Sequence, residues 1–210
     1  MAEESEREMP LRARAARIAA LVLAAGRSSR MEGQHKLVYE IDGVPLVRLA
    51  VEAALGSRCV QTLVVSGHGA EAVEAAIGDR PVSLVENPRP EDGMAASLRL
   101  GLRTLARDID GVVVLLADMP RITAAHVDRL VAAFDPASPA IVAPERGGRR
   151  GNPVLWPQRH FAEMMALSGD QGARSLLVRH AADLVLVPID DEAIFVDIDT
   201  AADLDRLARP

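Results

Sequence analysis

The chain has 210 residues, 49% of them hydrophobic, and carries a formal net charge of −6. This length suits one medium α/β domain with a sizeable core. The acidic charge argues against binding a phosphate backbone, and the 2% of aromatic residues argues against a surface that stacks single-stranded bases. We therefore expect no nucleic-acid partner.

Two further features of composition bear on compartment and boundaries. No apolar run reaches the ~18 residues that a membrane span needs, so we expect no membrane partner. A single cysteine, Cys59, excludes a disulfide framework and predicts a reducing, cytoplasmic compartment. Residues 1–17 begin acidic and lack an apolar core. They predict a flexible N-terminal extension before one domain over 18–210.

Short apolar runs alternate with helical periodicity through the first part of the chain. In order, the patterns predict strand 18–26, helix 45–55, strand 61–67, helix 70–77, strand 82–87, helix 93–106, strand 111–120 and helix 123–134. Strands that alternate with helices of this length indicate right-handed βαβ units and a parallel sheet.

The second half of the chain is less regular. We expect two strands around a Gly-Gly turn within 140–156, strands over 184–189 and 193–198, and a short helix from Thr200. The whole pattern predicts an α/β fold with a mostly parallel sheet and a small β-hairpin insertion in the second half.

The stretch "LVLAAGRSSRMEGQHK" (21–36) follows the first predicted strand and matches neither common phosphate-loop pattern. Small residues that let a ligand approach the backbone come first: Ala24, Ala25 and Gly26. Groups that bind phosphate follow: Ser28, Ser29, Arg30 and Lys36. Arg30 can grip phosphate oxygens as a fork, and Lys36 adds a point charge. The alternative is a solvated basic turn.

Two carboxylates are candidates for holding a metal ion. Asp118 follows an apolar strand and should lie at the same sheet edge as the loop, where Mg²⁺ could link it to phosphate oxygens. Asp118 could instead cap the helix that starts near Thr123. In "VDIDTAADL" (196–204), an extended backbone would point Asp197 and Asp199 to one side. Thr200 and the aspartate three residues later form a capping-box pattern. Asp199 is then available either as a second metal ligand or as a residue with a purely structural role in the turn.

Six motifs occur in a fixed order: "LAAGRSSRM" followed by Lys36, "NPRPEDGMAASLRLG", "LLADMP", "RRGNPVLW", "LSGDQGARSLL" and "DIDTAADL". Together they resemble the MobA-like nucleotidyltransferases over about residues 18–207, and within them most resemble the molybdenum cofactor cytidylyltransferases. The chain departs from the common pattern at Glu32, which is inserted before Gly33, and at Asp92.

The resemblance implies a Rossmann-like, three-layer α/β/α domain that transfers CMP from CTP to molybdopterin and releases pyrophosphate. It implies catalytic roles for Arg30, Lys36 and Asp118, and a Mg²⁺ site, with Mn²⁺ as a substitute, at Asp118 and Asp199. The nucleotide would contact Leu23, Ala24, Ala25, Gly26, Ser28, Ser29, Arg30, Lys36, Asn87, Gly93, Met94, Ser97 and Asp118.

The resemblance also implies a site for the acceptor. Its residues would be Gly151, Asn152, Pro153, Gly169, Asp170, Gly172 and Arg174. Arg149 and Arg150 could receive an anionic acceptor or form a solvated hairpin tip, and Asp170 could contact a pterin or cap a helix. The product would pass to a molybdoenzyme or its maturation factor.

Other functions remain open at this point. The same chemistry could use GTP, or another acceptor such as methylerythritol phosphate. A non-catalytic pterin carrier is a different class, although a carrier would not need a metal aspartate beside the nucleotide loop. The missing G-x-G-x-x-G pattern argues against a nicotinamide-dependent oxidoreductase.

Overall fold

A computed structural model of the chain describes residues 14–26, 35–169, 172–200 and 202–204. Its strands are β1 (Ile18–Ala24), β2 (Glu40–Ile41), β3 (Val44–Pro45), β4 (Gln61–Ser66), β5 (Ser83–Glu86), β6 (Gly111–Leu116), β7 (Ile141–Arg146), β8 (Arg149–Arg150), β9 (Val154–Pro157) and β10 (Leu184–Pro188). Its α-helices are α1 (Leu46–Leu55), α2 (Ala70–Ile77), α3 (Met94–Thr104), α4 (Ala124–Ala133), α5 (Phe161–Met165) and α6 (Arg174–Arg179). Its short 3₁₀ helices are η1 (Lys36–Val38), η2 (Pro90–Asp92), η3 (Gln158–His160), η4 (Ala181–Asp183) and η5 (Glu192–Phe195).

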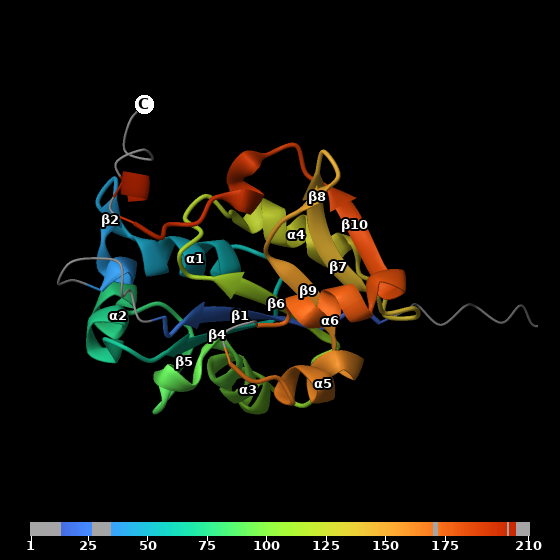
Figure 1. The fold of residues 1–210 in the computed structure, drawn as a ribbon, viewed down its shortest axis with the longest axis horizontal. Helices are drawn as coiled ribbons and strands as arrows, with labels where there is room; N and C mark the ends of the chain where they lie inside the picture. The colour runs from blue at the N-terminus through green and yellow to red at the C-terminus, as the bar shows by residue number, and fades with distance from the viewer. Residues whose placement is uncertain (1–13, 27–34, 170–171, 201, 205–210) are drawn as a thin grey trace, which may run out of the picture.

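The main sheet has the strand order β10-β7-β9-β6-β1-β4-β5, and β8 pairs with β7 (Figure 1). β1 pairs in parallel with β4 and β6, whereas β9 runs antiparallel to both β6 and β7. The mixed, mostly parallel α/β sheet confirms the predicted fold class. β7 and β8 form the expected hairpin, with Gly147 and Gly148 at φ +61° and +78° in its turn.

Helices cover both faces of this sheet. Alternate residues of β1 belong to different cores: Ala20 and Val22 pack with α1, α2 and α4, whereas Ala19 and Leu21 pack with α3, α5 and α6. This alternation follows from the two-residue period of a strand, and it requires a strand that is apolar on both faces. The three-layer α/β/α arrangement is therefore confirmed.

The expected strand over 193–198 is wrong. This segment begins with the 3₁₀ helix η5, because the Asp191 carboxylate accepts the N–H of Ala193 (2.8 Å) and caps the turn. Ala193 and Ile194 are buried, so the apolar run reflects packing rather than pairing in the sheet. A short apolar run does not separate these two cases. The argument that placed Asp197 and Asp199 on one side of a strand therefore fails.

Two predictions about helix ends are confirmed. Helix α2 ends at Gly78, which has φ +65° as a helix-terminating glycine requires. Residues 202–204 are helical after Thr200. Among the described residues, no helix has both the length and the apolar character needed to cross a bilayer.

Candidate active site

The pairing of β1 with β6 brings the glycine loop and Asp118 to one edge of the sheet. β1 ends at Ala24, just before Gly26, and β6 ends two residues before Asp118. Because the strands are parallel neighbours, their carboxyl ends meet. The N–H of Ala117 donates to the carbonyl of Leu23 (3.1 Å) and fixes the chain beyond β6 against β1.

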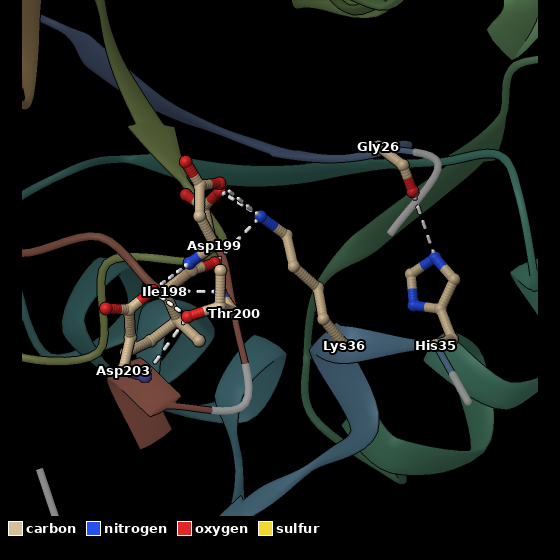
Figure 2. Close-up of polar contacts among 8 residues, drawn as sticks. Gly26, His35, Lys36, Ile198, Asp199, Thr200 and Asp203 are labelled. Atoms are coloured by element: carbon tan, nitrogen blue, oxygen red, sulfur yellow. Dashed lines mark hydrogen bonds and ion pairs between the residues drawn. The ribbon is translucent and has the colours of Figure 1, made fainter. Parts of the chain in front are cut away.

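Lys36 reaches into this edge and contacts two carboxylates and a carbonyl (Figure 2). Its Nζ lies 2.7 Å from Oδ2 of Asp118 and 3.4 Å from Oδ1 of Asp199, and it donates to the carbonyl of Ile198 at 2.9 Å. The Lys36 and Asp118 side chains are 12% and 23% exposed, and that of Asp199 is 49% exposed. Three segments that are distant in sequence thus form one charged cluster.

The turn after Asp199 has the hydrogen bonds of a capping box. The Asp203 carboxylate accepts the N–H and the hydroxyl of Thr200 at 2.8 and 2.7 Å, and the Asp203 N–H donates back to the Thr200 hydroxyl (3.3 Å). Asp203 also accepts the N–H of Asp199 (3.3 Å). This turn holds Asp199 at the cluster. A structural role for the motif in the turn is therefore compatible with a role of Asp199 in the site.

Asp118 does not cap the following helix. Helix α4 is capped by Thr123 and His126, which exchange the reciprocal hydrogen bonds of a capping box. The backbone carbonyl of Asp118 accepts the N–H of Ile198 (2.9 Å), and its side chain is directed to Lys36. The capping alternative for Asp118 is therefore wrong.

Negative charge accumulates around Lys36. Burial raises the pKa of Asp197, and the nearby charges of Asp199 and Asp118 raise it further. Within the described residues, the second oxygen of Asp118, Oδ1, is buried and has no hydrogen-bond partner. A buried acceptor without a donor is unusual and carries a desolvation cost. The donor set and this free oxygen fit a divalent cation, which takes one or two carboxylates plus phosphate oxygens.

A cleft of about 630 Å³ lies against the cluster. Several residues expected to contact the nucleotide line it: Leu23, Ala25, Gly26, Lys36, Gly93, Met94, Ser97 and Asp118. Asp199 lines it as well, together with residues that the sequence did not single out, namely Leu37, Pro90, Glu91 and Leu116. Pro90 and Glu91 lie three and two residues before Gly93 in the motif "NPRPEDGMAASLRLG", so their position was the available signal.

Some expected contacts lie elsewhere. Ala24 is fully buried in the core, and Asn87 is 5% exposed; neither lines the cleft. Asn87 instead donates from its amide to the Ser97 hydroxyl (3.0 Å), so it positions a cleft residue. Ser28, Ser29, Arg30, Glu32 and Asp170 lie outside the described residues.

His35 and Gly67 do not line the cleft but adjoin residues that do, and sequence spacing gave no signal for them. Nε2 of His35 lies 3.1 Å from the Gly26 carbonyl, which anchors the end of the described loop, and burial lowers the pKa of this histidine (Figure 2). A Cβ on Gly67 would lie 2.8 Å from the Cβ of Ala25 and 2.9 Å from that of Pro90. Glycine at this position thus allows the chain after β4 to lie close to Ala25 and Pro90, which line the cleft.

A second cleft, of about 820 Å³, adjoins the first, and both include Met94 and Leu116 in their linings. Four of the residues expected to bind the acceptor line it: Gly151, Asn152, Gly172 and Arg174. Pro153 and Gly169 do not line it. Gly169 accepts the N–H of Ala95 at the start of α3 (3.1 Å).

Three arginines and one tryptophan make the lining of the second cleft partly cationic and partly aromatic. Arg149, Arg150 and Arg174 line it, and Trp156, which is 1% exposed, forms part of its wall. The Arg149 guanidinium stacks over the Phe195 ring at 4.2 Å. The hairpin that carries two of these arginines is thus built into the cleft rather than being only a solvated tip.

Comparison with known proteins places this arrangement in a family. The MobA-like NTP transferase domain matches residues 20–184. The chain is 33% identical over 197 residues to purine catabolism protein PucB of Bacillus subtilis, covering 89% of this chain and 94% of that protein. It is 30% identical over 196 residues to nicotine blue oxidoreductase of Paenarthrobacter nicotinovorans, covering 90% and 96%.

Other matches are partial or structural. The bifunctional protein GlmU of Syntrophotalea carbinolica is 35% identical over 127 residues, which span only 27% of its length. The crystal structure of Rv0371c from Mycobacterium tuberculosis H37Rv superposes with a TM-score of 0.82 at 28% identity, covering 94% of this chain and 100% of that one. Together, the domain match and the full-length relatives show that the chain belongs to the MobA-like NTP transferase family.

Proposed function

We propose that this protein is a molybdenum cofactor cytidylyltransferase, which transfers CMP from CTP to molybdopterin and releases pyrophosphate. The observation that carries the proposal is the convergence of Lys36, Asp118 and Asp199 at a nucleotide-sized cleft beside a second, arginine-lined cleft. We further propose that residues 18–210 act as one domain in the cytoplasm. Of the extension expected over 1–17, residues 1–13 lie outside the described part of the chain, and Arg14 and Arg17 contact Asp110.

Asp118 and Asp199 would hold Mg²⁺, or Mn²⁺ in its place. Oδ1 of Asp118, which has no partner among the residues that the structure describes, supports this assignment, and so does the existence of a manganese complex of Rv0371c, which is 26% identical to this chain. The ion would neutralise phosphate charge and help to orient the α-phosphate. Lys36 would then turn from the carboxylates to the phosphates of the nucleotide.

The reaction needs no strong general base. A terminal phosphate oxygen of the acceptor attacks the α-phosphorus of CTP, and the bond between the α-phosphorus and its bridging oxygen to the β-phosphate breaks. Pyrophosphate leaves with the electron pair of that bond. Because the nucleophile is already an anion, positioning and charge neutralisation supply most of the catalysis. Lys36, with Arg30 from the loop, would stabilise the departing charge.

The base preference is assigned from Ala25. Ala24-Ala25-Gly26 resembles the cytidylyl branch of the family, whereas the guanylyl branch usually has Ala-Gly-Gly. The Ala25 Cβ projects toward the position that Gly67 leaves open, and Ala25 lines the cleft. Its methyl group would limit the room for a base at this wall.

The acceptor preference is assigned from the second cleft. Arg149, Arg150 and Arg174 can bind a phosphate by forked hydrogen bonds, and Trp156 with Leu177 offers an apolar wall for a ring system. A phosphorylated pterin has both features. A molybdoenzyme or its maturation factor would then receive the dinucleotide product.

One relative supports a second candidate. The 30% identical protein that matches over nearly the whole chain is named nicotine blue oxidoreductase, so an oxidoreductase activity is the second candidate. This alternative requires binding of a nicotinamide or another redox cofactor. It does not explain the cluster of Asp118, Asp199 and Lys36 at the first cleft.

A thermal-shift experiment separates the candidates. The melting temperature is measured with CTP, GTP, NADH and NADPH, each with and without Mg²⁺. A ligand at 100 times its Kd stabilises the folded protein by about 2.7 kcal/mol. We expect the largest shift with CTP and Mg²⁺. A larger shift with GTP than with CTP would overturn the base assignment. A shift with NADH or NADPH, and none with CTP or GTP, would overturn the transferase proposal.

A further inference from the structure

A group of three side chains that could hold a metal ion belongs to the segments at the start of α5 and after α6. Figure 1 shows where these two helices lie, and none of the three residues lines either cleft. His160, Glu163 and His180 each offer a ligand atom, and these atoms lie within 4.8 Å of one another. We call these three residues the histidine cluster. Nδ1 of His160 is 3.8 Å from Oε1 of Glu163, and Nε2 of His180 is 3.0 Å from Oε2 of Glu163.

The hydrogen bonding of His160 leaves a ring nitrogen directed into the cluster. Its side chain is only 6% exposed, and its Nε2 lies 2.9 Å from Oδ2 of Asp183. Nε of Arg159 lies 3.4 Å from the same nitrogen, but the Asp183 contact is the shorter one. An ionised carboxylate can only accept, so the Asp183 contact is a hydrogen bond in the tautomer that carries the proton on Nε2. The opposite nitrogen, Nδ1, is buried and has no hydrogen-bond partner in the described part of the chain. In that tautomer, Nδ1 holds a lone pair and lies 3.8 Å from Oε1 of Glu163.

Two carboxylates with cationic partners surround this ring. Glu163 pairs with His180 and with Arg179 (3.3 Å), and Asp183 pairs with Arg159 and with His160. The Nδ1 lone pair and the Glu163 carboxylate both offer electron pairs to the 3.8 Å space between them. A metal ion placed there would take both groups as ligands.

The two imidazole rings pack closely beside the Glu163 carboxylate. The ring centroids of His160 and His180 are 4.5 Å apart, and the rings are tilted by 56°. The three ligand atoms therefore converge, and a single divalent ion could take all of them.

We propose that His160, Glu163 and His180 bind a divalent transition metal of the zinc class. Two imidazoles and one carboxylate form a donor set that suits Zn²⁺ and not Mg²⁺, which prefers oxygen ligands alone. Asp183 would act as the outer carboxylate that orients His160, an arrangement typical of histidine–metal sites. Arg159 and Arg179 pair with Asp183 and Glu163 from the exposed side and would moderate the affinity.

The position of the cluster gives such a metal a structural consequence. The His160 ring packs edge-on against Trp156, with centroids 6.1 Å apart, and Trp156 lines the second cleft. Helix α6 carries Arg174 and Leu177 of that cleft, and His180 follows its last residue. Metal binding would tie α5 to the end of α6 and hold this wall of the second cleft in place.

The experiment titrates Zn²⁺ and Co²⁺ into full-length, chelator-treated protein. An Asp118→Asn background removes the competing carboxylate at the first cleft. Bound Co²⁺ is followed by its visible absorption, and Zn²⁺ by competition and by the melting temperature. His180→Gln removes one ligand but keeps a hydrogen-bond donor toward Glu163. His126→Gln is the matched control, because it removes an imidazole from the capping box of α4 while glutamine can keep the cap.

We expect one ion to bind per chain and the melting temperature to rise with Zn²⁺. Both effects should disappear in His180→Gln and persist in His126→Gln. Asp183→Asn should weaken binding by roughly 10- to 100-fold. Melting curves in chelator show whether each variant is folded. Absence of binding in the parent protein, or binding that survives His180→Gln unchanged, would overturn the proposal in favour of a proton-bridged cluster.

Discussion

Replacing Lys36 with methionine should have opposite effects on the two ligands of the first cleft. In the structure, the Lys36 ammonium occupies the space between Asp118 and Asp199, at 2.7 and 3.4 Å from their oxygens. A metal ion that enters between these carboxylates must therefore displace the lysine. Lys36→Met removes this internal competitor, and it also removes a positive charge that the nucleotide phosphates would use.

The size of the effect follows from the lost contact. A hydrogen bond to a charged group contributes about 1.5–3 kcal/mol, and the Lys36 side chain is largely buried, so solvent screens it weakly. Without this competition, the free protein should bind Mn²⁺ roughly 10- to 100-fold more tightly. Affinity for CTP in the presence of Mg²⁺ should fall.

Electron paramagnetic resonance of free Mn²⁺ measures the first effect without nucleotide, and calorimetry with CTP measures the second. Lys36→Arg is the control, because it keeps the charge and should show no gain in Mn²⁺ affinity. Equal or weaker Mn²⁺ binding by Lys36→Met would refute the idea that the lysine and the metal ion share one position.

Three further changes test other parts of the structure. Ala25→Gly should increase the ratio of GTP to CTP turnover, because it removes the methyl group from the cleft wall; an unchanged ratio in a competition assay would argue against a role for Ala25 in base selection. Gly101→Ala should lower the free energy of unfolding by about 1–3 kcal/mol in urea, since the new Cβ would lie 2.5 Å from Cδ1 of the fully buried Leu21; an unaltered midpoint would show that the core yields freely. Asp110→Asn should cost about 1 kcal/mol at pH 7, because Asp110 accepts the N–H of Arg17 at 2.7 Å and pairs with Arg14. Burial opposes but does not cancel the lowering of the Asp110 pKa by these contacts, so its contribution is present above the ordinary value of 3.8 and is lost as the pH falls through the lower folded-state value. A difference from wild type that persisted at the lowest pH would contradict this linkage.

The sheet edge that carries Asp118 could be predicted because local patterns determine it. An apolar strand that ends in an aspartate, beside another that ends in small residues, needs only the rule that parallel strands end at one edge. The partners of Lys36 could not be predicted in this way. Asp199 is 163 positions away, and its location depends on how the segment after β10 crosses the molecule.

The error over 193–198 has a related physical origin. Its apolar residues are buried against the hairpin: a Cβ on Gly151 would lie 2.5 Å from the Ile194 carbonyl, and that carbonyl accepts the N–H of Asn152 (3.0 Å). Burial therefore produced a strand-like pattern without a strand. The same tertiary contact brings the site motif after residue 196 to Asp118, through the hydrogen bond from Ile198.

The most direct test of the proposed activity is pyrophosphate release from CTP and molybdopterin in the presence of Mg²⁺. We predict release by the wild-type protein that requires both substrates, and a rate at least about 100-fold lower in a folded Asp118→Asn variant. Release with another phosphorylated acceptor in place of molybdopterin would contradict the acceptor assignment alone. No release with any acceptor in a panel, or an Asp118→Asn variant as fast as wild type, would contradict nucleotidyl transfer at this site.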